Sequence, residues 1–288
     1  MKKFLFSLLT VVLCLSLCSC QSLLQNAKSV ITGEPVSQMP ADFIAEGQNE
    51  EYSYEIYSDY IRIVKYIGEA TEITIPDKID GKPVKVIGSL CFHQTTAVTS
   101  VNIPKSVTTI ESSAFYYADK LVSISIPDNV TSVGSRAFAW CLALETVSIG
   151  NGVEEIPEYC FNSCKALKKV DIKSNIKRIG LRAFSYCENL EEFVIPKHIS
   201  KVGERAFSGC TSLKFLVFEN ASAEIGSRVI ADSPDVAIIA EKDSKVMNYC
   251  KENKLRWSSS KDIEAVVLGG DESASSEESQ ENAESDKK

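Results

Sequence analysis

The sequence predicts an α/β solenoid of about six to seven turns, each 23 residues long. An Ala-Phe pair recurs at this spacing, at Ala114-Phe115, Ala137-Phe138, Ala183-Phe184 and Ala206-Phe207. Short stretches that alternate apolar and polar residues recur with the same spacing. A fixed period in the twenties indicates stacked turns, each of which buries an apolar face against its neighbours. Because stacked strands lie about 4.8 Å apart, we expect these stretches to form a parallel sheet.

Residues 1–19 predict a signal peptide. Lys2 and Lys3 precede an apolar run from Phe4 to Leu17, which is short for a membrane span. The run ends in Leu-Cys-Ser-Cys, which resembles a bacterial lipobox with Cys20 at the lipidated position. The resemblance implies a lipid anchor on Cys20; an ordinary secretory signal with incidental cysteines is the alternative. Residues 20–48 hold few large apolar side chains and predict a flexible tether.

We expect an N-terminal β cap at residues 49–69 and the repeats at residues 70–233. Aromatic and β-branched residues alternate with polar ones on both sides of Ser58-Asp59, which indicates a β-hairpin. Within the repeats, we expect the Ala-Phe segments to form short helical turns. Glycine follows one apolar slot of most turns and predicts backbone with positive φ there. These glycines are Gly88, Gly134, Gly180, Gly203 and Gly226.

Residues 234–257 predict a C-terminal cap made of a strand and a helix. The strand is expected at 236–239, and an amphipathic helix at 244–255 would place Val246, Tyr249 and Cys250 on one side. Residues 258–288 are polar and acidic, so we expect a disordered tail.

The repeated unit resembles the BspA-like, Treponema-type leucine-rich repeats. Residues 121–141, LVSISIPDNVTSVGSRAFAWC, follow the family pattern L-x-x-I-x-I-P-x-x-V-x-x-I-G-x-x-A-F-x-x-C, and the match runs from Ile73 to Cys210. The regular asparagine ladder of ordinary leucine-rich repeats is missing. The resemblance implies a right-handed coil with the parallel sheet on its concave face. It also implies a bacterial surface protein that binds host matrix proteins or other bacteria.

Charge and composition argue against other classes of function. The formal net charge of −8 does not favour a nucleic-acid partner, which usually requires a basic face. The two histidines, His93 and His198, occupy different slots of different turns, so neither a metal site nor a nucleophilic triad is expected. The sequence predicts no enzymatic activity and no cofactor.

Four cysteines recur with the period of the repeat and should form a column. They are Cys141, Cys164, Cys187 and Cys210. A straight column does not supply the tetrahedral ligands of a metal site. We expect small buried apolar residues, and disulfides between neighbouring turns are the alternative in an exported protein.

The candidate binding surface is the outward face of the predicted strands, where solenoids commonly bind. Hydroxyl-bearing side chains predominate in its first half, and charged and then apolar ones follow. Its residues are Ser100, Asn102, Ser123, Ser125, Thr146, Ser148, Lys169, Asp171, Glu192, Val194, Phe215 and Val217. Val194, Phe215 and Val217 form a candidate hot spot for protein recognition. The alternative is that Ser and Thr are ordinary solvent-facing strand residues and that the C-terminal cap covers Phe215.

These observations together predict a lipid-anchored binding or adhesion module of the bacterial cell surface. Its concave sheet would bind a protein partner of the host matrix or of another bacterium, or a glycan, and the lipid on Cys20 would contact the membrane. A structural spacer of the cell envelope, without a dedicated ligand, is the alternative. An enzyme is a remote one.

Overall fold

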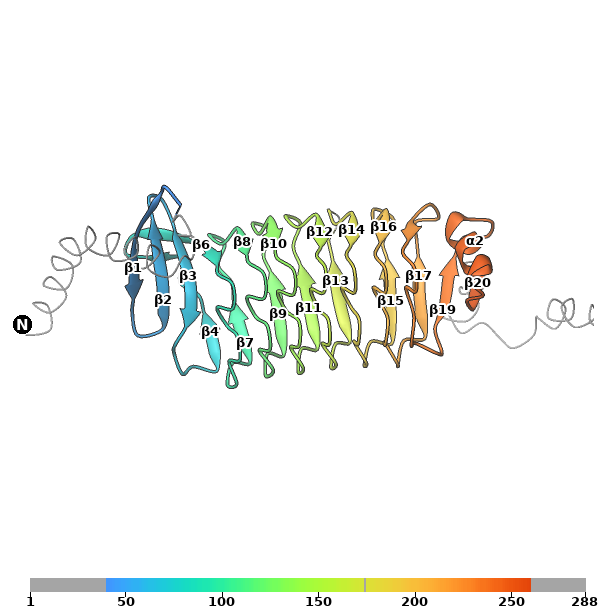
Figure 1. The fold of residues 1–288 in the computed structure, drawn as a ribbon, viewed down its shortest axis with the longest axis horizontal. Coiled ribbons are helices and arrows are strands. Elements are labelled where there is room, and N and C mark those ends of the chain that lie inside the picture. Colours follow the sequence, from blue (N-terminus) through green and yellow to red (C-terminus); the bar gives the residue numbers. More distant parts are fainter. Residues whose placement is uncertain (1–39, 174, 260–288) are drawn as a thin grey trace, which may run out of the picture. The chain divides into compact units, whose positions relative to one another are not determined.

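The computed structural model describes residues 40–173 and 175–259 (Figure 1). The chain divides into two compact units, Met1–Phe43 and Ile44–Lys288, and nearly all described residues belong to the second. In that unit the chain winds into a solenoid of parallel strands (Figure 1). The predicted signal peptide, Cys20, most of the predicted tether and nearly all of the predicted acidic tail lie outside the described residues.

One side of the solenoid is a row of parallel strands, here called the long-strand sheet. Its members are β4 (Glu72–Thr74), β7 (Ser100–Asn102), β9 (Ser123–Ile126), β11 (Thr146–Ile149), β13 (Lys169–Ile172), β15 (Glu192–Ile195), β17 (Phe215–Phe218), β19 (Ala237–Ala240) and β20 (Trp257–Ser259). The row therefore comprises about nine turns, not six or seven. The additional turns carry β19 and β20, where the Ala-Phe repeat has already ended.

Alternation of side chains explains why these segments form strands. In β9 the side chains of Ile124 and Ile126 are buried, whereas Ser123 and Ser125 are exposed. Neighbouring strands pair in register one repeat apart, so that Ile124 lies between Val101 and Val147. Each apolar position thereby stacks on its equivalent in the next turn, which fixes the register.

Short strands form the second side of the solenoid. They are β8 (Thr109–Ile110), β10 (Ser132–Val133), β12 (Glu155–Ile156), β14 (Arg178–Ile179), β16 (Lys201–Val202) and β18 (Glu224–Ile225). The first two continue a sheet that begins with β1 (Phe43–Gln48), β2 (Tyr52–Tyr57), β3 (Ile61–Tyr66) and β6 (Lys82–Ile87).

A hairpin of β2 and β3 lies at the N-terminal end of this sheet. The two strands pair antiparallel, and β3 pairs parallel with β6. The inserted residues before β6 form a second hairpin with β5 (Lys78–Ile79), with Asp80 and Gly81 at its tip in left-handed conformations. The prediction of a tether over residues 20–48 is wrong at its end, because residues 43–48 form β1. Gly47 lets the Tyr54 ring pack closely on β1, a contact that the polar sequence does not reveal.

The Ala-Phe segments form the third side, here called the turn side, and the prediction of helical turns is wrong there. Alternate N–H groups donate to the next turn: Ser113 to Ser135 (3.0 Å), Phe115 to Ala137 (2.7 Å) and Tyr117 to Ala139 (3.0 Å). Ser113 and Tyr117 adopt left-handed conformations, with φ of 58° and 62°, and their equivalents in later turns do so too. Residues in this conformation interrupt any helix. The described part of the solenoid is thus a β-solenoid with a single helix at its C-terminal end, not an α/β solenoid.

The core is a stack of phenylalanine rings along the axis. Neighbouring rings are nearly parallel, with centroids 4.7–5.4 Å apart. The stack consists of Phe92, Phe115, Phe138, Phe161, Phe184 and Phe207, all fully buried. Ala or Cys precedes each ring and allows the turn to approach it closely.

The recurrent glycines allow neighbouring turns to pack closely. They do not adopt positive φ, so the prediction of positive φ at these positions is wrong. Gly88, Gly134, Gly180, Gly203 and Gly226 are all outside the left-handed region. A Cβ on Gly203 would lie 2.5 Å from the backbone carbon of Gly180 in the preceding turn. No side chain fits at such a distance, so glycine is required sterically.

The helix α2 (Lys245–Glu252) lies between β19 and β20 in the chain. Ser244 caps its N-terminus by accepting the N–H of Met247 (3.0 Å). Its apolar face buries Val246, Met247 and Cys250 against the core. The Tyr249 hydroxyl donates to the carbonyl of Gly226 (2.9 Å), which ties the helix to the preceding turn.

Candidate binding surface

The predicted surface residues lie on the outward face of the long-strand sheet. Most are exposed, and Ser100, Ser148 and Val217 are partly exposed. The surface is not one continuous sheet, because the ladder of strands is divided between β13 and β15. Ser100 through Asp171 lie on a five-stranded sheet, and Glu192 through Val217 lie on a four-stranded one.

The apolar pair at the C-terminal part of this surface is exposed. Val194 is 45 % exposed and Phe215 is 36 % exposed. Phe215 lies in register between Glu192 on β15 and Ala237 on β19. Phe215 keeps this exposure although β19 pairs directly with β17, so the alternative in which the C-terminal cap covers the ring is wrong. Val194, Phe215 and the carboxylate of Glu192 therefore form an apolar patch with an acidic edge on rigid strands.

The cysteine column is buried and its thiols are free. Each thiol donates to the carbonyl of a Phe in the preceding turn, as in Cys141 to Phe115 (3.2 Å) and Cys187 to Phe161 (3.3 Å). Burial raises the pKa of Cys141 and of Cys210 to about 12. The thiols are therefore protonated donors of the core. In the next turn the hydroxyl of Ser233 takes the same role toward Phe207 (3.0 Å).

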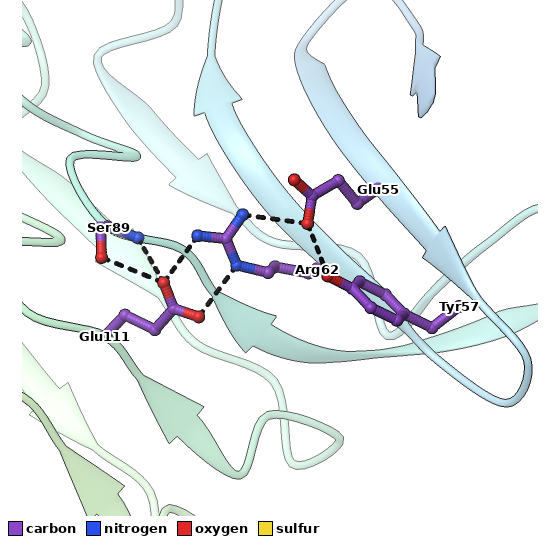
Figure 2. Close-up of polar contacts among 5 residues, drawn as sticks. All are labelled: Glu55, Tyr57, Arg62, Ser89 and Glu111. Carbon is purple, nitrogen blue, oxygen red and sulfur yellow. Dashed lines mark hydrogen bonds and ion pairs between the residues drawn. The ribbon is translucent and has the colours of Figure 1, made fainter. Parts of the chain in front are cut away.

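An ionic network fastens the N-terminal hairpin to the first repeats (Figure 2). The Arg62 guanidinium donates to both Glu111 oxygens, through Nε (2.9 Å) and Nη2 (2.7 Å), and to Glu55 through Nη1 (3.1 Å). Glu111 also accepts the backbone N–H (2.8 Å) and the hydroxyl (3.0 Å) of Ser89, and Tyr57 donates to Glu55 (2.8 Å). The Arg62 guanidinium holds the pKa of Glu111 below its usual range. Sequence reasoning missed this network, because its members are distant in the chain and follow no repeat.

A shallow pocket on the turn side was also missed. It has a volume of about 230 Å³. Its polar and aromatic lining includes Ser113, Tyr116, Arg136, Trp140, Tyr159 and Asn162. These residues come from neighbouring turns at the positions flanking the Ala-Phe pairs. The sequence feature that could have indicated the pocket is the recurrence of aromatic residues at such positions. Tyr117, Trp140 and Tyr186 are among them, and all three are exposed.

Over residues 40–173 and 175–259, no group of three or more His, Cys, Asp or Glu residues is arranged to hold a metal ion. Among the helices in that same part of the chain, none has the length and apolar character needed to cross a membrane.

Comparison with known proteins identifies the repeat. The model of the BspA type leucine rich repeat region matches residues 85–214 and 177–253, with six copies. A leucine-rich repeat protein from Eubacterium ventriosum is 28 % identical, with a TM-score of 0.55 over 64 % of this chain and 50 % of that one. One from Bacteroides ovatus is 24 % identical, with a TM-score of 0.54 over 68 % of this chain and 55 % of that one.

A leucine-rich cell surface protein from Faecalibacterium prausnitzii is 22 % identical, with a TM-score of 0.42 over 70 % of this chain and 77 % of that one. The chain thus spans only about half the length of the Eubacterium and Bacteroides proteins. A search of curated proteins gave no match. On the family match, which covers more than half of its residues, the chain belongs to the BspA-type leucine-rich repeat family.

Proposed function

We propose that this chain is an exported, lipid-anchored binding module that binds a protein partner through the outward face of the long-strand sheet. The observation that carries the proposal is the exposed apolar pair Val194 and Phe215 beside the Glu192 carboxylate. Exposed aromatic residues bordered by charges are common in the energetic centre of protein interfaces. Because strand side chains are held by the register of the sheet, such a site binds with little loss of conformational freedom.

The electrostatic surroundings support a partner with basic groups at the contact. Glu192 makes no ion pair within the described residues. The neighbouring Glu191, in contrast, is paired with Lys214 (2.9 Å). A basic side chain of the partner would find Glu192 available next to the apolar patch, which favours specificity as well as affinity.

Purified host matrix proteins, immobilised as a panel, test this proposal by surface plasmon resonance against the full chain. Truncation of a hot-spot side chain costs about 2 kcal/mol, so Phe215→Ala should weaken binding about 30-fold. Glu192→Ala should reduce the association rate and its dependence on salt. The matched controls are Tyr186→Ala, an exposed aromatic residue on the turn side, and Glu191→Ala, an acidic neighbour that is already paired.

Two results would overturn the site. One is unchanged affinity in both Phe215→Ala and Glu192→Ala. The other is equal loss in the controls, which would indicate a general effect on folding. Binding to no member of the panel, with the fold intact by circular dichroism, would favour a structural spacer of the envelope instead.

The membrane anchor is a separate proposal with its own test. Metabolic labelling with a fatty-acid analogue should label the wild-type protein and leave Cys20→Ala unlabelled in the native host. Replacement of Cys18, two residues earlier, is the matched control and should preserve labelling. Labelled Cys20→Ala protein would contradict the lipobox interpretation.

A further inference from the structure

The pocket on the turn side is formed by departures from the repeat. Ser113 is small where the neighbouring turns carry Leu90 and Arg136, and the side chains of Tyr116, Trp140 and Tyr159 line the space that it leaves. Trp140 is 37 % exposed, and its ring stacks on Tyr117 with centroids 5.8 Å apart. The aromatic wall is therefore held in place by its neighbours before any ligand arrives.

Arg136 supplies a positive charge at this pocket. Its guanidinium carbon lies 4.6 Å from the ring centroid of Tyr159, and Arg182 approaches the same ring at 5.8 Å. Stacking on a ring orients the guanidinium plane and leaves its N–H donors free at the edge. Arg136 forms no ion pair with any carboxylate of residues 40–173 or 175–259, although the chain is acidic overall.

Uncommitted hydroxyl groups lie around this charge. Within the structure as described, the hydroxyls of Ser113, Tyr116 and Tyr159 make no hydrogen bond to protein. Asn162 is different, because its amide nitrogen donates to the carbonyl of Ser185 (3.4 Å) and its oxygen accepts from Ser163 (3.1 Å). The pocket thus offers several free donors and acceptors, an unpaired guanidinium and exposed aromatic faces within one small volume.

We propose that this pocket binds a single carboxylate-bearing sugar residue of an acidic glycan. The guanidinium of Arg136 would donate two parallel hydrogen bonds to the carboxylate, the geometry that arginine favours. The C–H face of the sugar would pack on the aromatic wall, whose ring faces carry negative charge density. The three hydroxyls would pair with sugar hydroxyls.

The size and chemistry of the pocket favour a sugar over a peptide. At about 230 Å³ it is smaller than the ~300–1,000 Å³ of ordinary small-molecule sites, so it suits one ring and not a longer segment. An acidic peptide would satisfy Arg136 through a carboxylate, whereas a single sugar ring also carries several hydroxyls close enough together to pair with the three free hydroxyls in this small volume. Unpaired polar groups reduce affinity when they lose water.

A direct test measures binding of oligosaccharides to the full chain by isothermal titration calorimetry. The probe is a hyaluronan hexasaccharide, which alternates glucuronate and N-acetylglucosamine. Chitohexaose, which has the same number of rings and no carboxylate, is the neutral comparison. A keratan sulfate hexasaccharide, which carries sulfate groups and no carboxylate, separates sulfate from carboxylate recognition, and a hexaglutamate peptide tests the acidic-peptide occupant.

The repeat provides matched control variants. Arg136→Gln removes the guanidinium from the pocket, and Arg228→Gln removes the residue at the equivalent slot of a later turn, also left-handed (φ 53° against 58°). Trp140→Ala opens the aromatic wall, and Tyr186→Ala removes another exposed aromatic residue, which lies outside the pocket. Hyaluronan affinity should fall about tenfold or more in Arg136→Gln and in Trp140→Ala, and should be unchanged in the two controls.

Several results would overturn the proposal. They are equal binding of chitohexaose, which excludes the carboxylate; equal or tighter binding of the keratan sulfate hexasaccharide, which assigns sulfate; and equal binding of hexaglutamate, which assigns an acidic peptide. No binding of hyaluronan at millimolar concentration, or unchanged affinity in Arg136→Gln, would also overturn it. Because these residues lie off the long-strand sheet, failure here leaves the proposed protein-binding site to be judged by its own variants.

Discussion

Deleting the Glu111 carboxylate tests how the N-terminal hairpin is fastened to the solenoid. In the folded protein Glu111 accepts a two-pronged ion pair from Arg62 on β3, and it satisfies the backbone N–H of Ser89. Glu111→Ala removes all of these contacts at once. Arg62 keeps only its single bond to Glu55 (3.1 Å).

The expected cost follows from the partial burial of the pair. The Arg62 side chain is 20 % exposed and the Glu111 side chain is 28 % exposed. Exposed pairs contribute about 0.2–1 kcal/mol, and removing one partner of a buried pair costs about 3–5 kcal/mol. Because Glu55 partly compensates Arg62, we expect Glu111→Ala to lower the free energy of unfolding by about 2 kcal/mol. Glu191→Ala, which breaks a pair with side chains 62 % and 67 % exposed, should cost at most about 1 kcal/mol.

Urea unfolding, monitored by circular dichroism, measures the difference in unfolding free energy between the two variants. Urea is uncharged, so it does not screen the ion pairs as a salt would. Hydrogen exchange should locate the loss of protection in β2 and β3. If Glu111→Ala and Glu191→Ala shift the midpoint equally, or if exchange in the hairpin is unchanged, the network does not fasten the hairpin.

The same carboxylate gives the stability a defined dependence on pH. The pKa of Glu111 is lower in the folded protein than in the unfolded chain, mainly because of the hydrogen bonds from Arg62. Its contribution is therefore complete above the unfolded pKa of about 4.3 and is lost as the pH falls through the folded pKa. The difference in unfolding free energy between wild type and Glu111→Gln should stay constant from about pH 7 to 5 and narrow below about pH 4. A difference that grows on acidification would refute the assignment.

Three further predictions concern the core. Gly203→Ala should lower the free energy of unfolding in urea by more than about 2 kcal/mol, because its Cβ would overlap the Gly180 backbone. Gly81 has open space around it but a φ of +77°, so Gly81→Ala should cost only about 1 kcal/mol. Equal costs of the two substitutions would contradict the packing argument. Phe138→Ala should cost about 3–5 kcal/mol by the same measurement, since it opens a gap in the ring stack. Cys141 and Cys210, with pKa values raised to about 12, should resist a thiol reagent at pH 8 until unfolding, and rapid labelling seen by peptide mass spectrometry would show that they are accessible.

Much of the fold could be predicted because the sequence repeats its physical constraints. The alternation in segments such as residues 123–126 specifies a strand, and the fixed spacing of Phe115 and Phe138 specifies stacking. The backbone of the turn side could not be predicted in this way. Ser113 and Arg136 adopt left-handed conformations without being glycine, because hydrogen bonds to the next turn outweigh their local preference.

Features that occur once in the chain could not be predicted from the repeat pattern either. Arg62 and Glu111 meet across the junction of hairpin and repeats. Arg62 lies outside the repeats, and Glu111 occupies a slot that holds glycine in the neighbouring turns, at Gly88 and Gly134, so the shared pattern does not predict the ion pair. The turn-side pocket depends on Ser113, which is small where the following turns carry arginine or tyrosine, so the pattern shared by the turns does not reveal it. The outward face of the strands, in contrast, could be predicted residue by residue, because successive side chains of a strand point to opposite faces. The division of this face between β13 and β15 could not be predicted.

Hydrogen exchange on the complex with a matrix protein from the panel tests the central claim most directly. If the long-strand sheet is the binding surface, binding should slow exchange in Glu192–Ile195 and Phe215–Phe218, the strands that carry Glu192, Val194 and Phe215. Exchange on the turn side around Arg136 and Trp140 should stay unchanged. Protection confined to the turn side, with β15 and β17 unaffected, would contradict the account.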